Sequence, residues 1–414
     1  MTQPVLGILT LYLNDQGTLE EKSVYAKMIS SGRKLGLTIF VFTPDDVDFK
    51  QNKINALFYS PETRKWTRKW TGFPHMIYDR CRIQKSPRFE RLREFRSKYG
   101  HLTFLNRPLR NKWTVHRTLS KDSRFRGYLP ATRLAASVSD VSDMLRKHSL
   151  LFLKPINGTG GRGILQIERK KDGKVLLQGR NQARKIIQPI KVTQQGLGRF
   201  LESWNLKTVS HIVQQGLHLK LPNGRVHDYR MLVQKDRSGE WKFTGCAGRV
   251  GPLRSVTSNL HGGGQAIGMT ELLTQWVGAE KAAAVRQEAE QFGIDVAKYL
   301  EQSFGALCEL ALDLAIDRSG HIWLLEVNPK PAREVFAQAG EKETYRKAII
   351  RPLEYALYVY ERKKNRSSKL AADSKSKLSK SVKPAAHPDS PGWPYTEAEE
   401  AEVSFPREWL GENG

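Results

Sequence analysis

The sequence predicts an α/β protein with several lobes, and three observations lead to this fold class. Near the start, strand-like apolar runs at 5–13 and 37–42 flank a helical pattern over 20–35. Further along, a glycine-rich stretch at 157–163 lies between two strand-like runs. Towards the end, two alternating apolar runs are separated by four turn-forming residues, which is typical of a β-hairpin over 311–331.

Length and composition limit what the chain can be. Its 414 residues give room for two or three lobes, and a hydrophobic fraction of 39% can supply their cores. No run of 18 or more apolar residues occurs, so we expect no membrane span. Residues 1–10 are expected to form a first strand rather than a signal peptide. The three cysteines, Cys81, Cys246 and Cys308, lack metal-like spacing and indicate reduced thiols in a cytosolic-type compartment.

The net charge of +26 is concentrated in one region. Between Arg64 and Arg133 there are 20 Lys and Arg residues against 4 Asp and Glu. Such a surface attracts polyanions: nucleic acid, anionic polymer, acidic peptides or lipid head groups. No nucleic-acid-binding motif accompanies the charge, so we expect no specific nucleic-acid partner. A solvated basic face without a dedicated partner remains the alternative.

The first part of the chain is expected to form an N-terminal α/β lobe over 1–108. The strand–helix–strand order at its start suggests a small parallel unit. A further strand is expected over 73–79 and a basic helix over 87–98. The next part opens with a helix from Lys112 to about residue 119.

A buried strand carrying one lysine leads into the glycine-rich stretch. A loop over 129–132 and a helix over 140–148, with Asp140 as its N-cap, precede this strand at 150–155. Gly158, Gly160 and Gly163 formally fit the G-x-G-x-x-G pattern. A dinucleotide site needs a helix after such a loop, whereas 164–168 is strand-like. The pattern therefore predicts a flap whose backbone N–H groups cover phosphates, with a simple glycine-rich turn as the alternative.

The remaining elements follow in order. Residues 187–204 are expected to be a mostly helical connector, and the strand over 226–234 carries Asp228 and Arg230 on one face. The other expected elements are strands over 211–219 and 241–249, a loop over 257–265, and helices over 280–300 and 333–361.

Beyond residue 361 the composition changes. Residues 362–383 carry nine basic residues against Asp373, and 397–412 is acidic. This polarity predicts a disordered charged tail over 362–414. The tail also contains the aromatic residues Trp393, Tyr395, Phe405 and Trp409, through which it is expected to dock.

The hairpin predicts a cation site. One face of its second run is expected to carry Ile322, Leu324, Glu326 and Asn328, because side chains alternate along a strand. If the turn centres on residues 319–320, Asp313 lies directly across from Glu326. The oxygens of Asp313, Glu326 and Asn328 then suit Mg²⁺ shared with phosphate groups. An edge strand with solvated polar residues is the alternative.

Together these features predict a nucleoside triphosphate site. Lys154 precedes the glycine flap, and strand arginines Arg230 and Arg249 can neutralise phosphate oxygens. The carboxylate–amide cluster supplies Mg²⁺ ligands beside them. No G-x-x-x-x-G-K-[ST] loop and no protein-kinase motif is present.

At this point the sequence resembles the ATP-grasp fold and, within it, the YheC/YheD group of endospore coat-associated proteins. The resemblance covers about residues 5–360. It is carried by Lys112-Trp113, Leu129-Pro-Ala-Thr132, Lys154-Pro155, Gly158 to Gly163, Val213-Gln-Gln-Gly-Leu217, Asp228-Tyr-Arg230, Asn259-Leu260 and Glu326-Val-Asn-Pro-Lys-Pro331.

The resemblance implies two ATP-grasp subdomains, 109–215 with the flap and 216–361 with the metal hairpin, which clamp the nucleotide. It also implies roles for individual residues. Those implied to bind ATP are Lys112, Lys154, Gly158, Thr159, Gly160, Gly161, Arg162, Gly163, Gln214, Gln215, Gly216, Leu217 and Asn259. Within this set, Gln214 to Leu217 resembles the hinge at the adenine. Arg230, Arg249 and Lys154 are the implied catalytic residues, and Asp313, Glu326 and Asn328 the implied ligands of Mg²⁺ or Mn²⁺.

The implied activity is ATP-dependent ligation of a carboxylate to an amine or thiol through an acylphosphate, in a cytoplasmic, spore coat-associated protein active in sporulation. The acceptor is unidentified, and acidic polymers or other coat proteins are expected on the basic N-terminal lobe and tail. Familiar ligases of this fold often read Asn-x-x-Pro-Gly after the metal-binding strand. Here Asn328-Pro-Lys-Pro331 is followed by Ala332-Arg333 instead. Lys330 and Arg333 are therefore expected to meet an acidic acceptor. A non-catalytic coat protein that retains the fold is the alternative.

Overall fold

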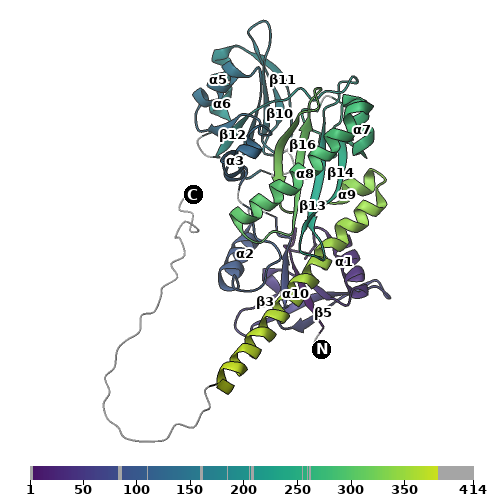
Figure 1. The fold of residues 1–414 in the computed structure, drawn as a ribbon. Coiled ribbons are helices and arrows are strands. Elements are labelled where there is room, and N and C mark those ends of the chain that lie inside the picture. Colours follow the sequence, from purple (N-terminus) through teal and green to yellow (C-terminus); the bar gives the residue numbers. More distant parts are fainter. Residues whose placement is uncertain are drawn as a thin grey trace, which may run out of the picture. The chain divides into compact units, whose positions relative to one another are not determined.

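The computed structural model describes most of the chain. The described residues are 3–82, 86–109, 111–158, 162–183, 185–204, 206, 209–253, 255–258, 260 and 263–380, with side chains described up to Lys369. The chain divides into two compact units, Met1–Lys364 and Asn365–Gly414. Within the described part of the first unit, the strands form three sheets (Figure 1). None of the described helices combines the length and apolar character needed to cross a membrane.

The first sheet confirms the predicted parallel unit. Strand β1 (Val5–Leu9) pairs in parallel with β2 (Thr38–Phe42) and with β6 (Met76–Asp79), and α1 (Lys22–Lys34) connects β1 to β2. Helix α2 (Pro87–Lys98) has the predicted bounds. The sheet also contains β3 (Val47–Asp48), β4 (Lys53–Ser60) and β5 (Lys65–Thr71), and a short 3₁₀ turn, η1 (Pro44–Asp46), precedes β3.

The β4–β5 hairpin was not predicted. Strand β5 contains basic residues and tryptophans instead of an apolar alternation, so no period-2 pattern marks it as a strand. It pairs with β4 along its whole length. Tertiary pairing has here overridden a weak local signal.

The second sheet carries the lysine strand and the flap. Its order is β11-β10-β9-β8-β12-β7. The strands are β7 (Thr132–Ala135), β8 (Leu150–Pro155), β9 (Ile164–Arg169), β10 (Val175–Arg180), β11 (Ile186–Val192) and β12 (His211–Gln215). Helices α5 (Val138–Lys147) and α6 (Gln194–Ser203) bury Val141, Leu197 and Leu201 against this sheet.

Two local predictions for this sheet were wrong. The N-cap of α5 is Ser137, whose hydroxyl accepts from the backbone N–H of Asp140, and Asp140 completes a capping box from inside the helix. The predicted helical connector over 187–204 begins as strand β11, because its first residues are β-branched, and becomes helical only after Thr193.

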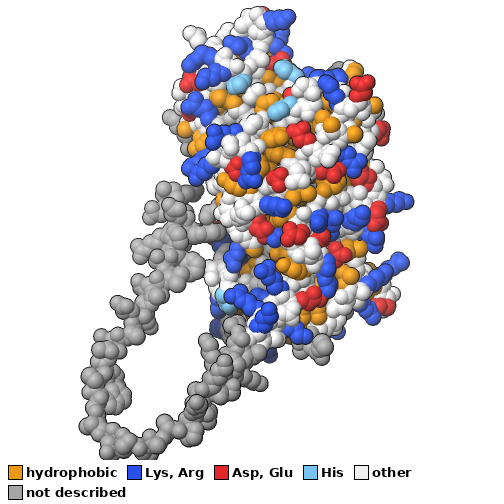
Figure 2. Space-filling model, in the orientation of Figure 1, with side chains coloured by type: hydrophobic (Ala, Val, Ile, Leu, Met, Phe, Trp, Pro, Cys, Tyr) orange, Lys and Arg blue, Asp and Glu red, His pale blue; other side chains and the backbone are white. Residues whose placement is uncertain are grey.

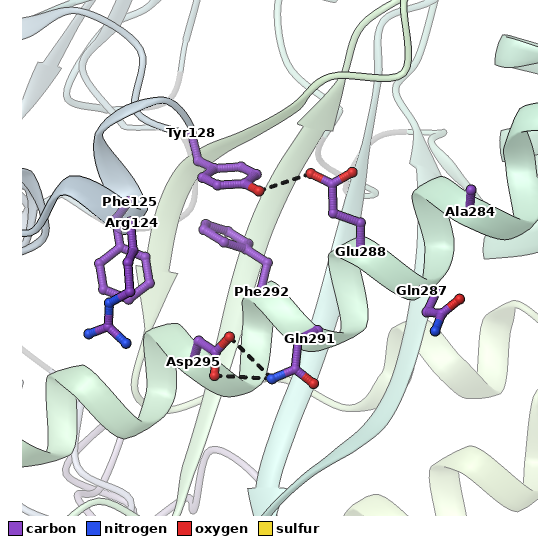
Figure 3. A pocket seen from close by; sticks show the side chains of 9 residues that line it. All are labelled: Arg124, Phe125, Tyr128, Ala284, Gln287, Glu288, Gln291, Phe292 and Asp295. Carbon is purple, nitrogen blue, oxygen red and sulfur yellow. Dashed lines mark hydrogen bonds between the residues drawn. The ribbon is translucent and has the colours of Figure 1, made fainter.

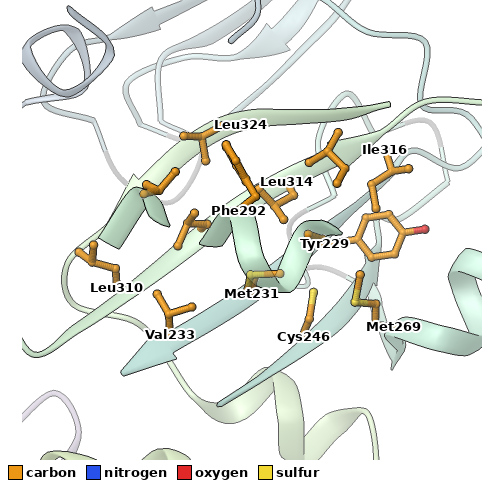
Figure 4. Packing of buried hydrophobic residues seen from close by; sticks show 14 of the residues in the cluster. Tyr229, Met231, Val233, Cys246, Met269, Phe292, Leu310, Leu314, Ile316 and Leu324 are labelled. Carbon is orange, nitrogen blue, oxygen red and sulfur yellow. The ribbon is translucent and has the colours of Figure 1, made fainter. Parts of the chain in front are cut away.

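One face of the third sheet is apolar, and the other, called here the polar face, carries charged residues next to a smaller apolar cluster around Leu232 and Phe336. The strand order is β15-β14-β13-β16-β17, and helices α7 and α8 pack on the apolar face. The elements are β13 (His227–Lys235), β14 (Trp241–Val250), β15 (Gln265–Gly268), α7 (Met269–Val277), α8 (Ala279–Phe304), β16 (Glu309–Ile316) and β17 (Ile322–Asn328). Figure 4 shows Met231, Leu314 and Leu324 gathered around Phe292 of α8.

The register of the β16–β17 hairpin confirms the predicted pair but not the predicted face. Asp313 pairs with Glu326, whereas Leu314 pairs with Leu324, so β17 contains one extra residue at a bulge. Residues directly opposite share a face, and successive residues of β16 alternate. Leu324 therefore faces the core while Glu326 faces away from it, and the expectation that Ile322, Leu324, Glu326 and Asn328 share one face was wrong.

The remaining helices include one that passes the predicted boundary at residue 361. They are α3 (Lys112–Ser120), α4 (Ser123–Arg126), α9 (Glu334–Gln338) and α10 (Lys342–Lys380). The polar composition beyond residue 361 argues against a core, but Lys, Leu and Ala are good helix formers and allow α10 to continue. The predicted aromatic and acidic segment lies outside the described residues.

A buried ion network joins the first and third sheets. Glu309, at the start of β16, accepts from Arg80 at 2.6 Å and from Arg333 at 2.5 Å, and all three side chains are fully buried. The hydroxyl of Tyr78 also donates to Glu309. Arg80 further donates to the carbonyl of Pro331 at 3.0 Å, so the segment that follows β17 is fixed by the same network.

We predict that Glu309→Ala destabilises the protein by about 3–5 kcal/mol, because it leaves two buried guanidinium groups without their shared carboxylate. Urea unfolding followed by circular dichroism measures the change. The matched control is Glu343→Ala, which removes an exposed pair with Arg346 and should leave the unfolding midpoint where it is. Equal midpoints for both variants would contradict a structural role of the network.

Candidate functional site

Charged side chains gather on the polar face of the third sheet, opposite α8. Cross-strand pairing places Asp228 beside Arg249, Arg230 beside Asp313, and Asp313 beside Glu326. Directly opposite residues share a face, so the strands β14, β13, β16 and β17 contribute to one charged surface. The structure thus brings together predicted residues that are far apart in the sequence.

Asp313 lies at the centre of an arginine–aspartate ladder. Its Oδ2 accepts from Arg230 Nη2 at 3.0 Å and lies 3.1 Å from Arg249 Nη2. Arg249 also donates to both oxygens of Asp228, at 2.7 and 2.6 Å. Burial raises the pKa of Asp313, but the charges of Arg230 and Arg249 outweigh burial and hold this pKa below its usual range. Asp313 is therefore ionised.

Asp228 is the functional candidate that the sequence analysis did not select. It is buried, and its carboxylate fixes the guanidinium of Arg249 through two parallel hydrogen bonds. The sequence contained a signal for this role, because Asp228 was expected on the same strand face as Arg230. Its partner could not be found from local sequence, because Arg249 lies on the next strand.

The three predicted cation ligands lie near one another but are engaged by protein groups. Asn328 Nδ2 lies 3.5 Å from Asp313 Oδ2, and Glu326 Oε1 lies 3.5 Å from Lys112 Nζ. An all-oxygen set of two carboxylates and one amide fits Mg²⁺ chemically. Both oxygens of Asp313 are bound by arginines, so a cation at this carboxylate would compete with the guanidinium groups. Within the described ranges, no group of three or more His, Cys, Asp or Glu side chains forms a metal-binding arrangement.

Lys112 bridges the flap and the hairpin. It is the first residue of α3, whose N-cap Asn111 accepts from the backbone N–H of Thr114 at 2.9 Å. Its ammonium donates to the carbonyl of Gly158 and pairs with Glu326. The side chain therefore lies between the glycine loop and the predicted cation ligands.

Lys154 has no carboxylate partner among the side chains that the structure describes. On β8, its ammonium donates to Gln214 Oε1 at 2.7 Å and lies 5.5 Å from the ring centroid of Phe152. Burial lowers the pKa of Lys154 to about 8, against the opposing charges of Glu326, Asp313 and Asp228. A half-buried ammonium with only neutral hydrogen-bond partners can accept an anion.

The predicted adenine hinge is held against β8. Gln215 N donates to Ala131 O and Gly216 N to Leu150 O, each at 2.8 Å. A Cβ atom on Gly216 would lie 2.4 Å from the Leu150 side chain, so only glycine allows this approach. Gln214 links the hinge to Lys154 and donates to Thr132 Oγ1 at 3.1 Å. A role for Gln214 to Leu217 in adenine binding stays a prediction.

The flap is described only at its two ends. Thr159, Gly160 and Gly161 lie outside the described residues, as does Asn259. Gly163 has a φ of 63°, which favours glycine, and its N–H donates to Asn181 O at 3.1 Å. Arg162 is exposed, and Gly158 lies against Pro155.

The expectation that Lys330 and Arg333 meet an acidic acceptor was wrong. Lys330 Nζ is bound to Asp79 Oδ1 at 2.6 Å, and Arg333 is fully buried against Glu309. Both residues instead hold the end of β17 to the first sheet. The lysine of the Pro329-Lys330-Pro331 segment therefore has a structural role.

A separate hollow of about 620 Å³ lies on the helical side of the third sheet, and none of the predicted site residues lines it (Figure 3). It lies between α4 and α8, where the Tyr128 and Phe292 rings stack at 4.3 Å. The Tyr128 hydroxyl donates to Glu288 at 2.9 Å. The polar groups of this hollow are largely paired with one another, so it does not resemble the charged face of the third sheet.

The lysine strand beside a glycine flap, followed by a sheet that carries paired arginines and an acidic hairpin, defines a protein of the ATP-grasp class. More narrowly, the chain belongs to the YheC/D-like ATP-grasp family, whose sequence profile matches residues 101–359.

Two curated relatives come from Bacillus subtilis (strain 168). The endospore coat-associated protein YheD is 25% identical over 368 residues, covering 87% of this chain and 79% of that protein. The endospore coat-associated protein YheC is 26% identical over 341 residues, covering 81% of this chain and 92% of that protein.

Solved structures are similar at lower identity. The D-cycloserine synthetase DcsG is 14% identical with a TM-score of 0.49, covering 86% of this chain and 99% of that chain. The D-alanine–D-alanine ligase of Coxiella burnetii is 12% identical with a TM-score of 0.47, covering 89% of this chain and 99% of that chain.

We predict that ATP binding takes up protons near pH 8 through Lys154. A phosphate beside Lys154 favours the ammonium form, so binding should raise its pKa, and affinity should fall as the pH rises above about 8. Titration calorimetry of ATP in buffers of different ionisation enthalpy measures the proton uptake.

Lys154→Met should bind ATP more weakly and without this pH dependence, whereas the exposed Lys171→Met serves as control and should behave like the wild type. The same pH dependence in the wild type and in Lys154→Met would remove Lys154 from the site.

Proposed function

We propose that the protein binds ATP with Mg²⁺ and acts as a ligase that activates a carboxylate as an acylphosphate. The observation that carries the proposal is the charge arrangement on the polar face. The ladder of Asp228, Arg249, Asp313 and Arg230 is balanced, and Lys112 pairs with Glu326. Lys154 is left with a neutral amide as its hydrogen-bond partner.

The formal charge of this set favours an anion. Four cationic side chains face three carboxylates, which leaves one positive charge in a largely buried site. A bare cation would meet net repulsion, whereas a triphosphate would meet attraction. We therefore expect the cation to enter together with the phosphates.

Each residue then has a role that its position supports. Lys112 and Lys154 bind phosphate oxygens, and the flap from Gly158 to Gly163 covers them. Gln214 and Gln215 end β12, the strand that pairs with β8 beside Lys154, and Gly216 and Leu217 follow them; this segment receives the adenine ring. Arg230 and Arg249 stabilise the transferred phosphoryl group.

Asp313, Glu326 and Asn328 would hold Mg²⁺, which when bound neutralises charge that develops on the phosphate oxygens. Asp313 can join this set by giving up its hydrogen bonds to Arg230 or Arg249. The released guanidinium would then be free to bind phosphate, so both groups change partner together.

The proposed reaction has two steps. A substrate carboxylate oxygen attacks the γ-phosphorus of ATP, the bond to the bridging oxygen breaks, and ADP leaves. An amine or thiol then attacks the acyl carbon, and phosphate leaves with the bond electrons as the amide or thioester forms. The nucleophile loses one proton to solvent or base. Lys154, Arg230 and Arg249 act by charge and position in the first step.

In this proposal, the boundaries between the domains follow the boundaries between the sheets. The N-terminal lobe is 1–108, the flap subdomain 109–215 and the metal-hairpin subdomain 216–361, with the tail over 362–414. The change of sheet between β12 and β13 supports the boundary at 215. Because the curated relatives are endospore coat-associated proteins, we place the activity in spore formation.

Turnover can be tested with purified protein, Mg-ATP and an extract of sporulating cells. Mass spectrometry should detect ADP and a new amide or thioester, and hydroxylamine should trap the acylphosphate as a hydroxamate. Lys154→Met should abolish all three signals, while Lys171→Met should keep them. Absence of turnover in the wild type, with ATP still bound, would favour the non-catalytic coat protein instead.

We predict that Glu326→Gln reduces the rise in melting temperature that Mg-ATP produces, because a ligand stabilises the folded state in proportion to its affinity. Thermal-shift titration with and without Mg²⁺ measures this. Glu343→Gln, an exposed site on α10, is the matched control and should keep the wild-type shift. If the Mg-ATP shift is unchanged in Glu326→Gln, Glu326 does not belong to the site.

A further inference from the structure

A second hollow, of about 630 Å³, lies on the first sheet between α1 and the β4–β5 hairpin. Its lining includes three cationic side chains and two aromatic rings: Lys22, Lys27, Arg64, Tyr59 and Trp66. None of these residues belongs to the proposed nucleotide site. Figure 2 shows Lys and Arg side chains spread over the visible face, with Asp and Glu side chains between them.

The two rings form a platform beside the cations. The Tyr59 and Trp66 centroids are 5.1 Å apart and tilted by 43°, and both rings are half-buried. Lys22 Nζ lies 5.9 Å from the Trp66 centroid. Along β5, Trp70 shares a face with Trp66, since Trp66 pairs with Tyr59 and Trp70 with Asn55. Trp70 is 60% exposed.

The three cations lack carboxylate partners within the part of the chain that the structure describes. Their neighbours Arg33 and Arg68 are paired, with Glu62 and Asp46 respectively. Lys27 instead donates to the neutral Tyr345 hydroxyl at 3.0 Å. A solvated basic face would carry such charges too, but it would not gather them around two rings in a hollow.

Arg64 gives a second indication of function. It ends the β4–β5 turn with a φ of 54°, a conformation in which glycine or asparagine is more usual. The position holds an arginine that lines the hollow. Backbone strain of this kind often marks a binding segment.

We propose that this hollow and the adjoining face of β5 bind single-stranded nucleic acid without sequence preference. Bases would stack on Trp66 and Trp70, and Lys22, Lys27 and Arg64 would meet phosphates. Aromatic platforms beside a positive groove bind single strands in this way, because every base offers a stacking face. The second exposed tryptophan along the strand favours a polymer over a single nucleotide.

The experiment compares two full-length variants that lose the same charge. One is Lys22→Gln/Lys27→Gln/Arg64→Gln, in the hollow. The control is Lys121→Gln/Lys171→Gln/Lys281→Gln, at exposed positions outside it. Fluorescence anisotropy of a labelled oligothymidine at several salt concentrations measures affinity, with an abasic oligomer and polyglutamate as further probes. Mg-ATP binding, measured in parallel, should be unchanged in both variants.

We expect the wild type to prefer oligothymidine over both other probes. The hollow variant should lose at least tenfold in affinity, and its salt slope should fall by about 2, since each single-strand phosphate contact contributes roughly 0.7. Trp66→Leu, which keeps an apolar group in the hairpin, should reduce the preference for oligothymidine over the abasic oligomer, and Trp66→Leu/Trp70→Leu should remove it.

Three results would overturn the proposal. Equal losses in the two triple variants would mean that overall charge, and not the hollow, drives binding. Equal affinity for the abasic oligomer and oligothymidine in the wild type would exclude base stacking. Tighter binding of polyglutamate would assign the hollow to acidic peptides.

Discussion

The position of the Asp313 carboxylate is the constraint on which the site depends. It accepts from Arg230 and Arg249, lies across from Glu326, and is contacted by Asn328. A carboxylate buried on a sheet face is unfavourable unless cations are held beside it. Both arginines lie on the β13 side of Asp313, Arg230 on the neighbouring strand and Arg249 on β14, and the Asp228 carboxylate holds the guanidinium of Arg249. In the proposed function, the arrangement that stabilises this face also supplies a guanidinium group to the phosphate.

Because β17 has one extra residue at a bulge, the hairpin contributes side chains to both faces of the third sheet. Up to Leu324 the strand completes the apolar core under α8, and from Glu326 it completes the polar site. A regular hairpin with the pairing seen next to the turn would have put Glu326 on the core face. The sequence predicted the Asp313–Glu326 pair from a turn centred between residues 319 and 320, whereas the pairing next to the turn, Leu314 with Leu324, centres on residue 319. The prediction reached the right pair because the bulge compensates for the turn.

Local patterns predicted the elements whose signal is local. The strand at 150–155 is an apolar run, and α2 begins at a proline and repeats its apolar positions, so both were placed correctly. Strand β5 was missed because its pattern is basic and aromatic. The roles of Lys330 and Arg333 were misjudged because their partners, Asp79 and Glu309, are brought close only by packing of two sheets. Long-range ion pairs leave no periodic trace in a sequence.

A crystal structure of the full-length protein with Mg²⁺ and a non-hydrolysable ATP analogue tests the central claim most directly. The account predicts the triphosphate beside Lys112, Lys154, Arg230 and Arg249, with the cation on Glu326, Asn328 and Asp313. It also predicts that Asp313 has given up a hydrogen bond to at least one arginine. An analogue bound elsewhere, or an intact arginine–aspartate ladder with no phosphate against Lys154, would contradict it.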